Sequence, residues 1–565
     1  MTKILILSGA LLVPALLAAQ EPSPPRFADE LDVEVVNVDL VASGEDGAPV
    51  ADLTAEDFEV LDDGQPVQIT HFSGTSVGEG EAQAAPLHLV ILFDDAQIQP
   101  AERSSAYAGI ARQLDRLLGA ADRVLVARLG AGLRIVQPFT SDPALVAAAL
   151  KQLERDSPGV PSDAAARKAV LDEIRFGDAP SANALGSAQV VGSQMQSNAE
   201  MAAGTSLTSV RAYAERRQAE VLQSLVSLDR LASALAGLPG RKAMLLVSPG
   251  FDLRPGEGIY QTWLEKYRST RAAHGSGSVD LERPGWDLRT AVRDLAAGAG
   301  ANRVAVYATA PAGGASARPD PRNVGASAAQ TETGAGESLH LLTQGTGGMA
   351  VFNLEGIERL AEGLESDLRH SYSLAYLSPR SSPQEGDGAW HPLEVRVRRP
   401  GVRLRAPAGY RAKSPDLRTQ ERAAAALLLG VSENPLDIRV DLAEGKRERD
   451  GSYTVPVTVK VPLAKLTLLP HGSEHQGRLA IFLLTQAESG LTSGNKLEAP
   501  VRITNAQMVA AMGQTGAFAT SVRLRPGIYR LAVAVRDDVA AVESAVSLEL
   551  KVEDGKKKGK DKDAS

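Results

Sequence analysis

The sequence contains no cysteine in its 565 residues. This absence excludes disulfide bonds, cysteine nucleophiles and thiolate metal ligands, and with them thiol-dependent enzymes and zinc–cysteine sites. A chain without disulfides must gain its stability from packed hydrophobic cores. The length is too great for one core and predicts about three domains.

Aromatic residues are also scarce, and the balance of charge is mildly acidic. Aromatic residues make up 4% of the chain, and its formal net charge is −9. Because nucleic-acid-binding surfaces need basic patches and often stacked aromatic rings, the composition predicts no nucleic-acid partner. Hydrophobic residues at 44% and charged residues at 23% are typical of a globular protein.

No apolar run in the sequence is long enough to cross a bilayer. The best candidate, Ile4–Ala18, follows Lys3, is interrupted by Pro14 and is shorter than the ~20 residues that a span requires. A basic residue, a short apolar run and small residues around Ala19 predict a secretory signal peptide over residues 1–19. A membrane anchor is the alternative interpretation. We expect an exported protein, periplasmic or secreted, with no stable membrane insertion.

Two β-rich segments flank the middle of the chain. Residues 31–72 alternate apolar and polar side chains, Thr54 is a candidate cap for one helical turn, and Asp63-Gly64 is a hairpin turn signal. The alternation returns in residues 371–410. Because a short β segment cannot bury a core alone, residues 31–72 are expected to pair with residues 385–412, with the intervening part inserted between two strands.

Strands and helices alternate between the two flanking segments. The apolar strand candidates are residues 87–93, 123–127, 132–137, 242–247, 303–308 and 349–352. The helical candidates are residues 101–119, 142–154, 206–237, 287–298, 336–343 and 356–370. This order predicts the α/β class, with a doubly wound, mostly parallel sheet of six strands. Only "RLGA" separates the second and third strands, so that pair is predicted to be antiparallel.

The remaining segments complete the predicted domain plan. Residues 155–205 and 252–286 are polar and rich in small residues, which predicts surface insertions or mobile loops. Repeated strand patterns over residues 425–552 predict an all-β, Ig-like sandwich. The charge run over residues 553–565 predicts a disordered tail. The predicted α/β domain itself extends over residues 87–377.

Three stretches of sequence together resemble one known family. They are "GAPVADLTAEDFEVLDDGQPVQITHF", "GRKAMLLVSPGFD" and "DLRHSYSLAYLSP…WHPLEVRVRRPGVRLRAPAGY". With the predicted strand order, they resemble the VWFA-related exported proteins of acidobacteria, which contain a von Willebrand factor type A domain. The resemblance covers about residues 31–412. It implies a signal peptide, a β segment, a type A domain and a β return, and it implies no biochemical activity.

The resemblance also raises the question of a metal site after the first strand of the sheet. Type A domains often bind a divalent cation through Asp-x-Ser-x-Ser, a threonine and a further aspartate, which supply the oxygen ligands that hard cations need. Asp94 matches the first position, but Ala96 and Ile98 stand at the two serine positions, and Pro249 stands at the later aspartate. We therefore predict a degenerate site that holds no metal and no cofactor. The alternative role for Asp94 and Asp95 is to cap the helix that follows near Gln99-Pro100.

The same edge of the sheet is the predicted contact surface for a partner. Ligands of open α/β sheets bind at the carboxyl ends of the strands. The candidate partner-binding residues there are Asp94, Asp95, Gln97, Ser157, Ser248 and Asp252. The first functional hypothesis is a non-enzymatic, adhesion-type binding protein that contacts a protein or an extracellular polymer.

Two short motifs support a second hypothesis, an extracytoplasmic hydrolase. "GTSVG" around Ser76 matches a nucleophile elbow, but a polar linker follows it where a helix is needed. "HGSEH" at His471–His475 matches a zinc-protease signature, but Pro470 and Gly472 favour a polar hairpin. We therefore predict no catalytic residues. A scaffold within an envelope or secretion assembly is a third hypothesis.

Overall fold

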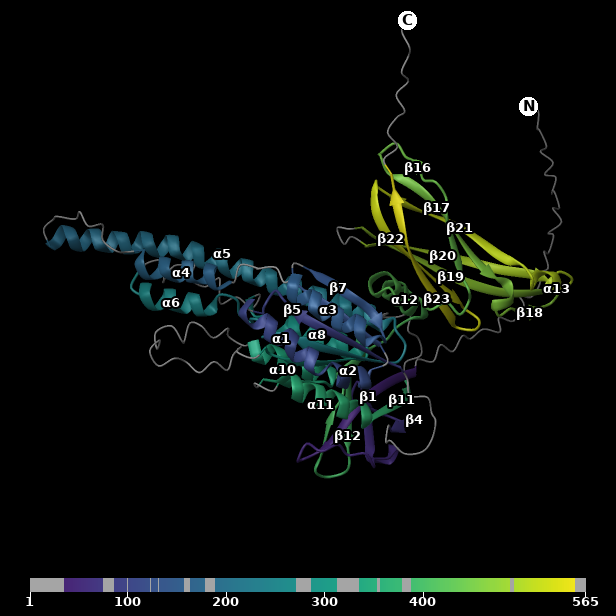
Figure 1. The fold of residues 1–565 in the computed structure, drawn as a ribbon, viewed down its shortest axis with the longest axis horizontal. Helices are drawn as coiled ribbons and strands as arrows, with labels where there is room; N and C mark the ends of the chain where they lie inside the picture. The colour runs from purple at the N-terminus through teal and green to yellow at the C-terminus, as the bar shows by residue number, and fades with distance from the viewer. Residues whose placement is uncertain are drawn as a thin grey trace, which may run out of the picture.

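The structure is a computed structural model that describes residues 35–74, 86–98, 100–121, 123–130, 132–156, 163–177, 188–270, 286–311, 335–352, 356–378, 388–487 and 492–553. Within these ranges the protein combines an α/β part with β-rich parts on either side (Figure 1). The predicted signal peptide lies outside the described residues, as does the predicted tail from residue 554 onward.

A six-stranded sheet forms the centre of the α/β part, with the strand order β10-β9-β8-β5-β6-β7. Its strands are β5 (Leu87–Asp94), β6 (Arg123–Leu129), β7 (Leu133–Thr140), β8 (Arg241–Val247), β9 (Val304–Thr309) and β10 (Met349–Val351). Neighbouring strands are parallel except β6 and β7, which are antiparallel. The six strand predictions and the antiparallel pair are confirmed, because continuous apolar runs such as β5 are buried on both faces.

Helices cover both faces of this sheet. One face packs against α5 (Ala188–Ala236), α8 (Arg289–Ala301) and α10 (Ala335–Thr346). The other face packs against α1 (Pro100–Arg112), α2 (Leu114–Ala120), α3 (Pro143–Asp156) and α11 (Gly356–Arg369). The predicted helix over residues 101–119 is therefore two helices, separated at Gln113.

The segments before and after the six-stranded sheet pair with each other. In one sheet the strand order is β13-β1-β11-β4, formed by β1 (Val35–Gly44), β4 (Ile69–Gly74), β11 (Ser371–Leu377) and β13 (Val402–Arg405). In the other it is β14-β12-β2-β3, formed by β2 (Phe58–Asp62), β3 (Gln65–Val67), β12 (Trp390–Val397) and β14 (Gly409–Arg411). The two sheets share one hydrophobic core. The expected pairing across the insertion is thus present, as in the register of Val60 with Val395.

Local turn signals in the first segment behave as predicted. The Thr54 backbone N–H donates to Asp57 at 2.8 Å at the start of the 3-10 turn η1 (Ala55–Asp57). Asp63 and Gly64 have φ values of 49° and 77° and connect β2 to β3. Two positive φ angles in succession match a tight hairpin, in which glycine is the least strained residue.

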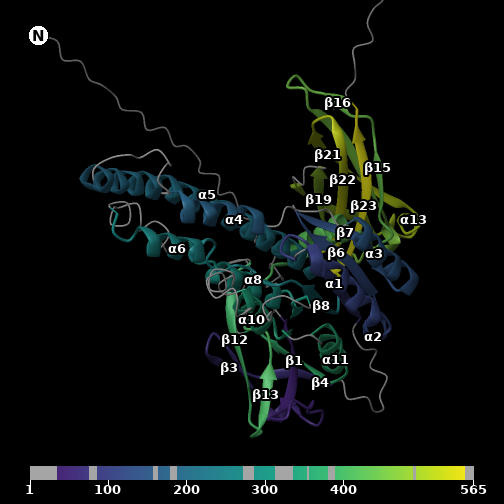
Figure 2. The ribbon, with the colours of Figure 1, turned by 60° about the vertical axis from the view of Figure 1, so that its left-hand side comes forward.

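Three helices form an arm that projects from the α/β part (Figures 1 and 2). We call α4 (Asp163–Phe176), α6 (Glu257–Tyr267) and the N-terminal part of α5 the helical arm. Trp263 is fully buried in a separate core between these helices, together with Val210 and Ile174. Of the two predicted alternatives, mobile loops are wrong for the described parts of these segments, which are helical, and the projecting arm agrees with a surface insertion. Alanine favours helix formation, and the aromatic residues of α6 supply the apolar face that the helices need.

The C-terminal part begins with a helix that the sequence analysis did not predict. Helix α12 (Pro415–Leu429) begins at Ser414, whose hydroxyl accepts a hydrogen bond from the Leu417 N–H, and ends at Gly430 with φ of 69°. Ala425 packs into the core between the six-stranded sheet and the helices that cover it. Ala426 packs against Phe482 of the β-rich unit that follows α12. Residues 425–429, expected to open the β-rich unit, are therefore helical and join it to the α/β part.

Two β-sheets with one shared hydrophobic core follow α12. Their strands are β15 (Arg439–Leu442), β16 (Lys446–Arg447), β17 (Tyr453–Pro462), β18 (Leu469–His471), β19 (Glu474–Ala487), β20 (Thr492–Thr504), β21 (Thr515–Leu524), β22 (Gly527–Asp537) and β23 (Val542–Val552). Alternating buried and exposed residues along β17 show why this sequence pattern predicts strands. None of the helices in the described ranges has an apolar stretch long enough to span a bilayer.

Candidate functional site

Polar residues meet where the parallel strands of the six-stranded sheet end. Asp94 is the last residue of β5, Ser248 directly follows β8, and Thr309 ends β9. Because parallel strands end at the same edge, Asp94 and Ser248 come together as expected from the sequence. Thr309, which was not predicted, lies beside them, and its carbonyl accepts the Ser248 N–H at 3.0 Å. All three are fully buried. We call this edge, with the residues that follow β5, the sheet rim.

Asp94 lies at the centre of the sheet rim. Its Oδ2 accepts a 2.7 Å hydrogen bond from the Ser248 hydroxyl, which in turn accepts the Gly250 N–H at 3.1 Å. Its Oδ1 is buried and has no hydrogen-bond partner among the described residues. Burial raises the pKa of Asp94 to about 7, against the lowering effect of the Ser248 hydrogen bond, and the neighbouring Asp95 charge raises it further.

Asp95 contacts other residues than Asp94 does. Its Oδ1 accepts a 2.8 Å hydrogen bond from the Tyr107 hydroxyl, and its Oδ2 lies 3.8 Å from a guanidinium nitrogen of Arg128. Arg103 donates to the Asp95 backbone carbonyl at 2.8 Å. Burial raises the pKa of Asp95, whereas the Tyr107 hydrogen bond and the two arginines lower it. This carboxylate holds α1 and β6 against the end of β5.

Gln97 connects the sheet rim to the long helix α5. Its Oε1 accepts a 3.0 Å hydrogen bond from Arg217, which also donates to Glu220 at 2.8 Å. The backbone N–H groups of Gln97 and Ile98 both donate to the Asp94 carbonyl, at 3.1 and 2.9 Å. The chain therefore turns tightly after β5 and places Gln97 beneath the base of the helical arm.

The structure brings four of the six predicted partner-binding residues together. Asp94, Asp95, Gln97 and Ser248 are all buried at the sheet rim. Asp252 lies farther along the loop after β8, where its carboxylate accepts the Arg254 N–H at 3.0 Å. Ser157 lies outside the described residues. Since the four clustered side chains are covered by other residues, their contact with a partner stays a prediction.

The capping interpretation of the two aspartates stays a prediction, because residue 99, directly before α1, lies outside the described residues. The described side-chain hydrogen bonds of the two carboxylates have other partners. The carboxylate of Asp94 binds the Ser248 hydroxyl, and that of Asp95 binds the Tyr107 hydroxyl. Neither is a backbone N–H group at the start of α1. The reason is that β8 and α1 present hydroxyl donors at the end of β5, and these are contacts between distant parts of the chain.

The sheet rim does not fit the divalent cation that the family resemblance implies. Ala96 and Ile98 offer no side-chain oxygen, and Ile98 is buried in the core on the α1 face of the sheet. One oxygen of Asp94 is already engaged by Ser248. Among the residues that the structure describes, no three His, Asp or Glu side chains are grouped to hold a metal ion. A hard cation needs more fixed oxygen ligands than this edge supplies.

The arginines and the tyrosine that surround the two aspartates were not predicted from the sequence. Arg103 and Tyr107 are four residues apart, which places them on one face of α1. That spacing, close after two carboxylates, was an available signal. Arg217 gave no such signal, because it is 120 residues from Gln97 in the sequence.

The two catalytic motifs do not gain support from the structure. His471 ends β18 and pairs with Glu474 at the start of β19, while His475 pairs with Pro470. Successive residues of a strand point to opposite faces, so Glu474 and His475 diverge and the zinc-protease arrangement on a helix is not present. The predicted hairpin is confirmed. Ser76 lies outside the described residues.

Comparison with known proteins gives no family assignment. No family model matches the sequence, and no curated protein matches it. Among solved structures, BatB from Bacteroides thetaiotaomicron aligns at 10% identity, with 50% of this chain and 98% of that chain covered and a TM-score of 0.21. The pilus adhesin SpaC from Lactobacillus rhamnosus GG aligns at 8% identity, with 82% and 56% covered and a TM-score of 0.25. The type V pili tip protein Mfa5 from Porphyromonas gingivalis aligns at 8% identity, with 92% and 77% covered and a TM-score of 0.22. TM-scores this low do not establish a shared fold.

Proposed function

We propose that this protein is an exported, non-enzymatic binding protein whose central unit is a type A-like domain with a degenerate metal site. The strand order β10-β9-β8-β5-β6-β7, with only β7 antiparallel to its neighbour, supports the type A assignment. The apolar N-terminal run supports export. The partner is a protein or an extracellular polymer.

One observation carries the proposal: the edge of the sheet where ligands of α/β folds bind continues into the helical arm. Helix α5 has 49 residues, which corresponds to about 70 Å of helix. The middle of α5 contacts the sheet rim, where Arg217 donates a hydrogen bond to Gln97. The N-terminal part of α5 packs against α4 and α6. A projecting arm with its own core extends the reach of the domain and presents a large contact surface.

The chemistry of the sheet rim favours binding over catalysis. An enzyme site needs titratable groups that open into a concave pocket. Here the carboxylates of Asp94 and Asp95 are buried and hold neighbouring elements through Ser248, Tyr107 and Arg128. Their altered pKa values follow from burial in this structural network and give no argument for an acid–base pair.

Site-specific photo-crosslinking in the native cell envelope tests the proposal. Phe176 and Met201 on the helical arm are 68% and 63% exposed, so a photoreactive amino acid fits at either position. The matched control position is Val509 in the C-terminal β-rich unit, 90% exposed. We expect both arm positions to crosslink to the same partner and the control to give no such product. Crosslinking at the control alone, or at no position, would contradict a binding role for the helical arm.

A further inference from the structure

A cavity of about 280 Å³ lies at the opposite end of the six-stranded sheet from the sheet rim. Its walls come from all three parts of the protein. The first residues of β1, the turn from α5 to β8 and the turn from α8 to β9 meet α12 and one residue of β23 there. The α12 backbone approaches so closely that a Cβ atom at Gly237 would lie 2.2 Å from the Glu421 carbonyl oxygen. We call this space the junction cavity.

The junction cavity is strongly cationic, although the chain as a whole is acidic. Its cationic lining residues are Lys242, Arg303, Arg411, Lys413, Arg418 and Arg422. Against these six stand two acidic lining residues, Glu421 and Glu543. Such a concentration of one charge in a partly enclosed space attracts ligands of the opposite charge.

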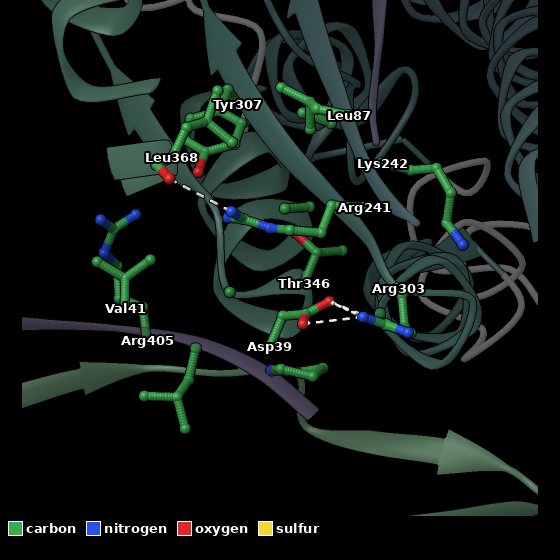
Figure 3. Close-up of a pocket in the computed structure, with 16 residues that line it drawn as sticks. Asp39, Val41, Leu87, Arg241, Lys242, Arg303, Tyr307, Thr346, Leu368 and Arg405 are labelled. Atoms are coloured by element: carbon green, nitrogen blue, oxygen red, sulfur yellow. Dashed lines mark hydrogen bonds and ion pairs between the residues drawn. The ribbon is translucent and has the colours of Figure 1, made fainter. Parts of the chain in front are cut away.

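Carboxylates neutralise one group of these cations. Arg303 donates to Asp39 at 2.9 Å, and a smaller cavity beside the junction cavity shows the same ion pair (Figure 3). Lys413 lies 2.8 Å from Glu421. Arg422 donates to Glu543 at 2.9 Å and to Glu433 at 2.6 Å. These ion pairs hold the walls of the cavity together. The positive charge that they do not neutralise belongs to other lining residues.

Neither Lys242 nor Arg411 forms an ion pair with a carboxylate of the described residues, although the charge of Glu421 acts on both from a longer distance. The ammonium group of Lys242 is buried and donates only to the Leu238 backbone carbonyl, at 3.2 Å. The Nε atom of Arg411 is buried without a hydrogen-bond partner in the described part of the chain. A buried cation without an ion-pair partner is costly, which applies to Lys242, and a buried guanidinium N–H of the half-buried Arg411 is left without an acceptor. An anion bound between them would relieve both costs.

The electrostatic surroundings of Lys242 agree with a missing counter-charge. Burial lowers the pKa of Lys242 to about 7, and the nearby charges of Arg303 and Lys413 lower it further. The carboxylates of Asp39 and Glu421 raise it, but not enough to offset these effects. Figure 3 shows the Lys242 side chain extending toward the side of the sheet where Arg303 lies.

We propose that the junction cavity binds a phosphate group, held by Lys242 and Arg411. A guanidinium group binds phosphate oxygens through two N–H groups, and an ammonium group adds a point charge. A multiply charged oxyanion matches two uncompensated cations better than a single carboxylate. The phosphate is either inorganic phosphate or the terminal group of a phosphomonoester. Because its walls belong to three parts of the protein, the bound anion also holds these parts together.

Calorimetric titration of the full chain tests this proposal, with inorganic phosphate and glycerol phosphate as separate probes at constant ionic strength. We expect one saturable site for at least one probe. The variants Arg411→Gln and Lys242→Gln should each weaken binding at least tenfold. Arg439→Gln is the control, because Arg439 is an exposed residue of β15 that pairs with Asp437. It should bind like the wild type.

Thermal unfolding separates ligand binding from a merely structural role of these cations. A ligand that binds only the folded protein raises its unfolding temperature. Phosphate should therefore raise the Tm of the wild type and of Arg439→Gln, and at the same concentration it should raise the Tm of the two cavity variants by less. Absence of saturable heat with both probes would overturn the proposal. Equal binding by wild type and cavity variants would also overturn it, because it would indicate an adventitious ion only.

Discussion

Arg217 of helix α5 donates a 3.0 Å hydrogen bond to Gln97 at the sheet rim, and both side chains are buried. This contact joins two residues that are 120 positions apart in the sequence. It fixes the root of the helical arm to the turn that follows β5. The position of the arm relative to the sheet therefore depends on a buried charged hydrogen bond.

Replacing Arg217 should loosen this junction. Arg217→Met keeps an unbranched side chain but leaves the Gln97 carbonyl without its donor, which should cost about 1.5–3 kcal/mol of unfolding free energy. Hydrogen exchange should become faster in residues 96–98 and in the middle of α5. The control is Arg216→Met, since Arg216 is exposed and lies 3.5 Å from Glu220 and over the Tyr213 ring on the helix surface. An equal effect of both variants on denaturant unfolding would contradict the assigned role of Arg217.

Asp94 should make the protein less stable as the pH rises. Burial raises the pKa of this carboxyl group from 3.8 to about 7, so the folded state keeps a proton that the unfolded chain has already lost. Stability from this group is complete below about pH 4 and is lost as the pH rises to about 7. Asp94→Asn keeps the acceptor for Ser248 without the charge. We expect the variant to be more stable than wild type at pH 8, on the order of 2 kcal/mol.

Denaturant unfolding at pH 4 and pH 8 measures this difference. The gain from Asp94→Asn should be small at pH 4 and largest at pH 8. Asp115→Asn serves as the control, because Asp115 is exposed on α2 and its removal should change stability equally little at both values. A gain that does not depend on pH would show that ionisation of Asp94 is not its cause.

The sheet rim should not bind a divalent cation tightly. Two of the positions that would supply hydroxyl oxygens are Ala96 and Ile98, and Asp94 already accepts a hydrogen bond from Ser248. Few fixed oxygen ligands give weak binding. Calorimetric titration with Mg²⁺ or Ca²⁺ should therefore show no micromolar site. Micromolar binding that Asp94→Ala abolishes would falsify this prediction.

The parts of the fold that depend on local pattern could be predicted from the sequence. The six strands of the central sheet were found because apolar runs such as Leu87–Phe93 need burial on both faces. The hairpin at Asp63-Gly64 was found because few residues accept its backbone angles. Helix α12 was missed although Ser414 and Gly430 carry the usual start and stop signals.

The parts that depend on distant contacts could not be predicted. Asp94 and Ser248 were both named as candidate residues, but their direct hydrogen bond depends on the register of β5 with β8. The helices of the arm outside residues 206–237 were not predicted, because the core of the arm is assembled from three segments that are distant in the sequence. The apolar face of α6 is buried only by its contacts with the other two. The cationic lining of the junction cavity likewise comes from residues scattered between Lys242 and Arg422.

Trp263 should hold the helical arm together independently of the six-stranded sheet. Its ring is fully buried, and its Nε1–H donates to the Ala203 carbonyl and to the Ser206 hydroxyl, both at 3.1 Å. Trp263→Ala removes the indole ring from the core of the arm and removes both hydrogen bonds. We expect a loss of about 3–5 kcal/mol in the local unfolding free energy of the arm. Phe176→Ala is the matched control, because Phe176 lies on the same arm but is exposed, and should change stability by less than about 0.5 kcal/mol.

Hydrogen exchange followed by mass spectrometry distinguishes loss of the helical arm from loss of the whole fold. In Trp263→Ala, amides of α4, α6 and the N-terminal part of α5 should exchange faster, while those of β5 and β8 keep their protection. This pattern is expected because the core of the arm is separate from the two cores that flank the sheet. Equal loss of protection in β5 would show that the arm and the sheet unfold as one unit, and the arm could then not act as an independent projecting element.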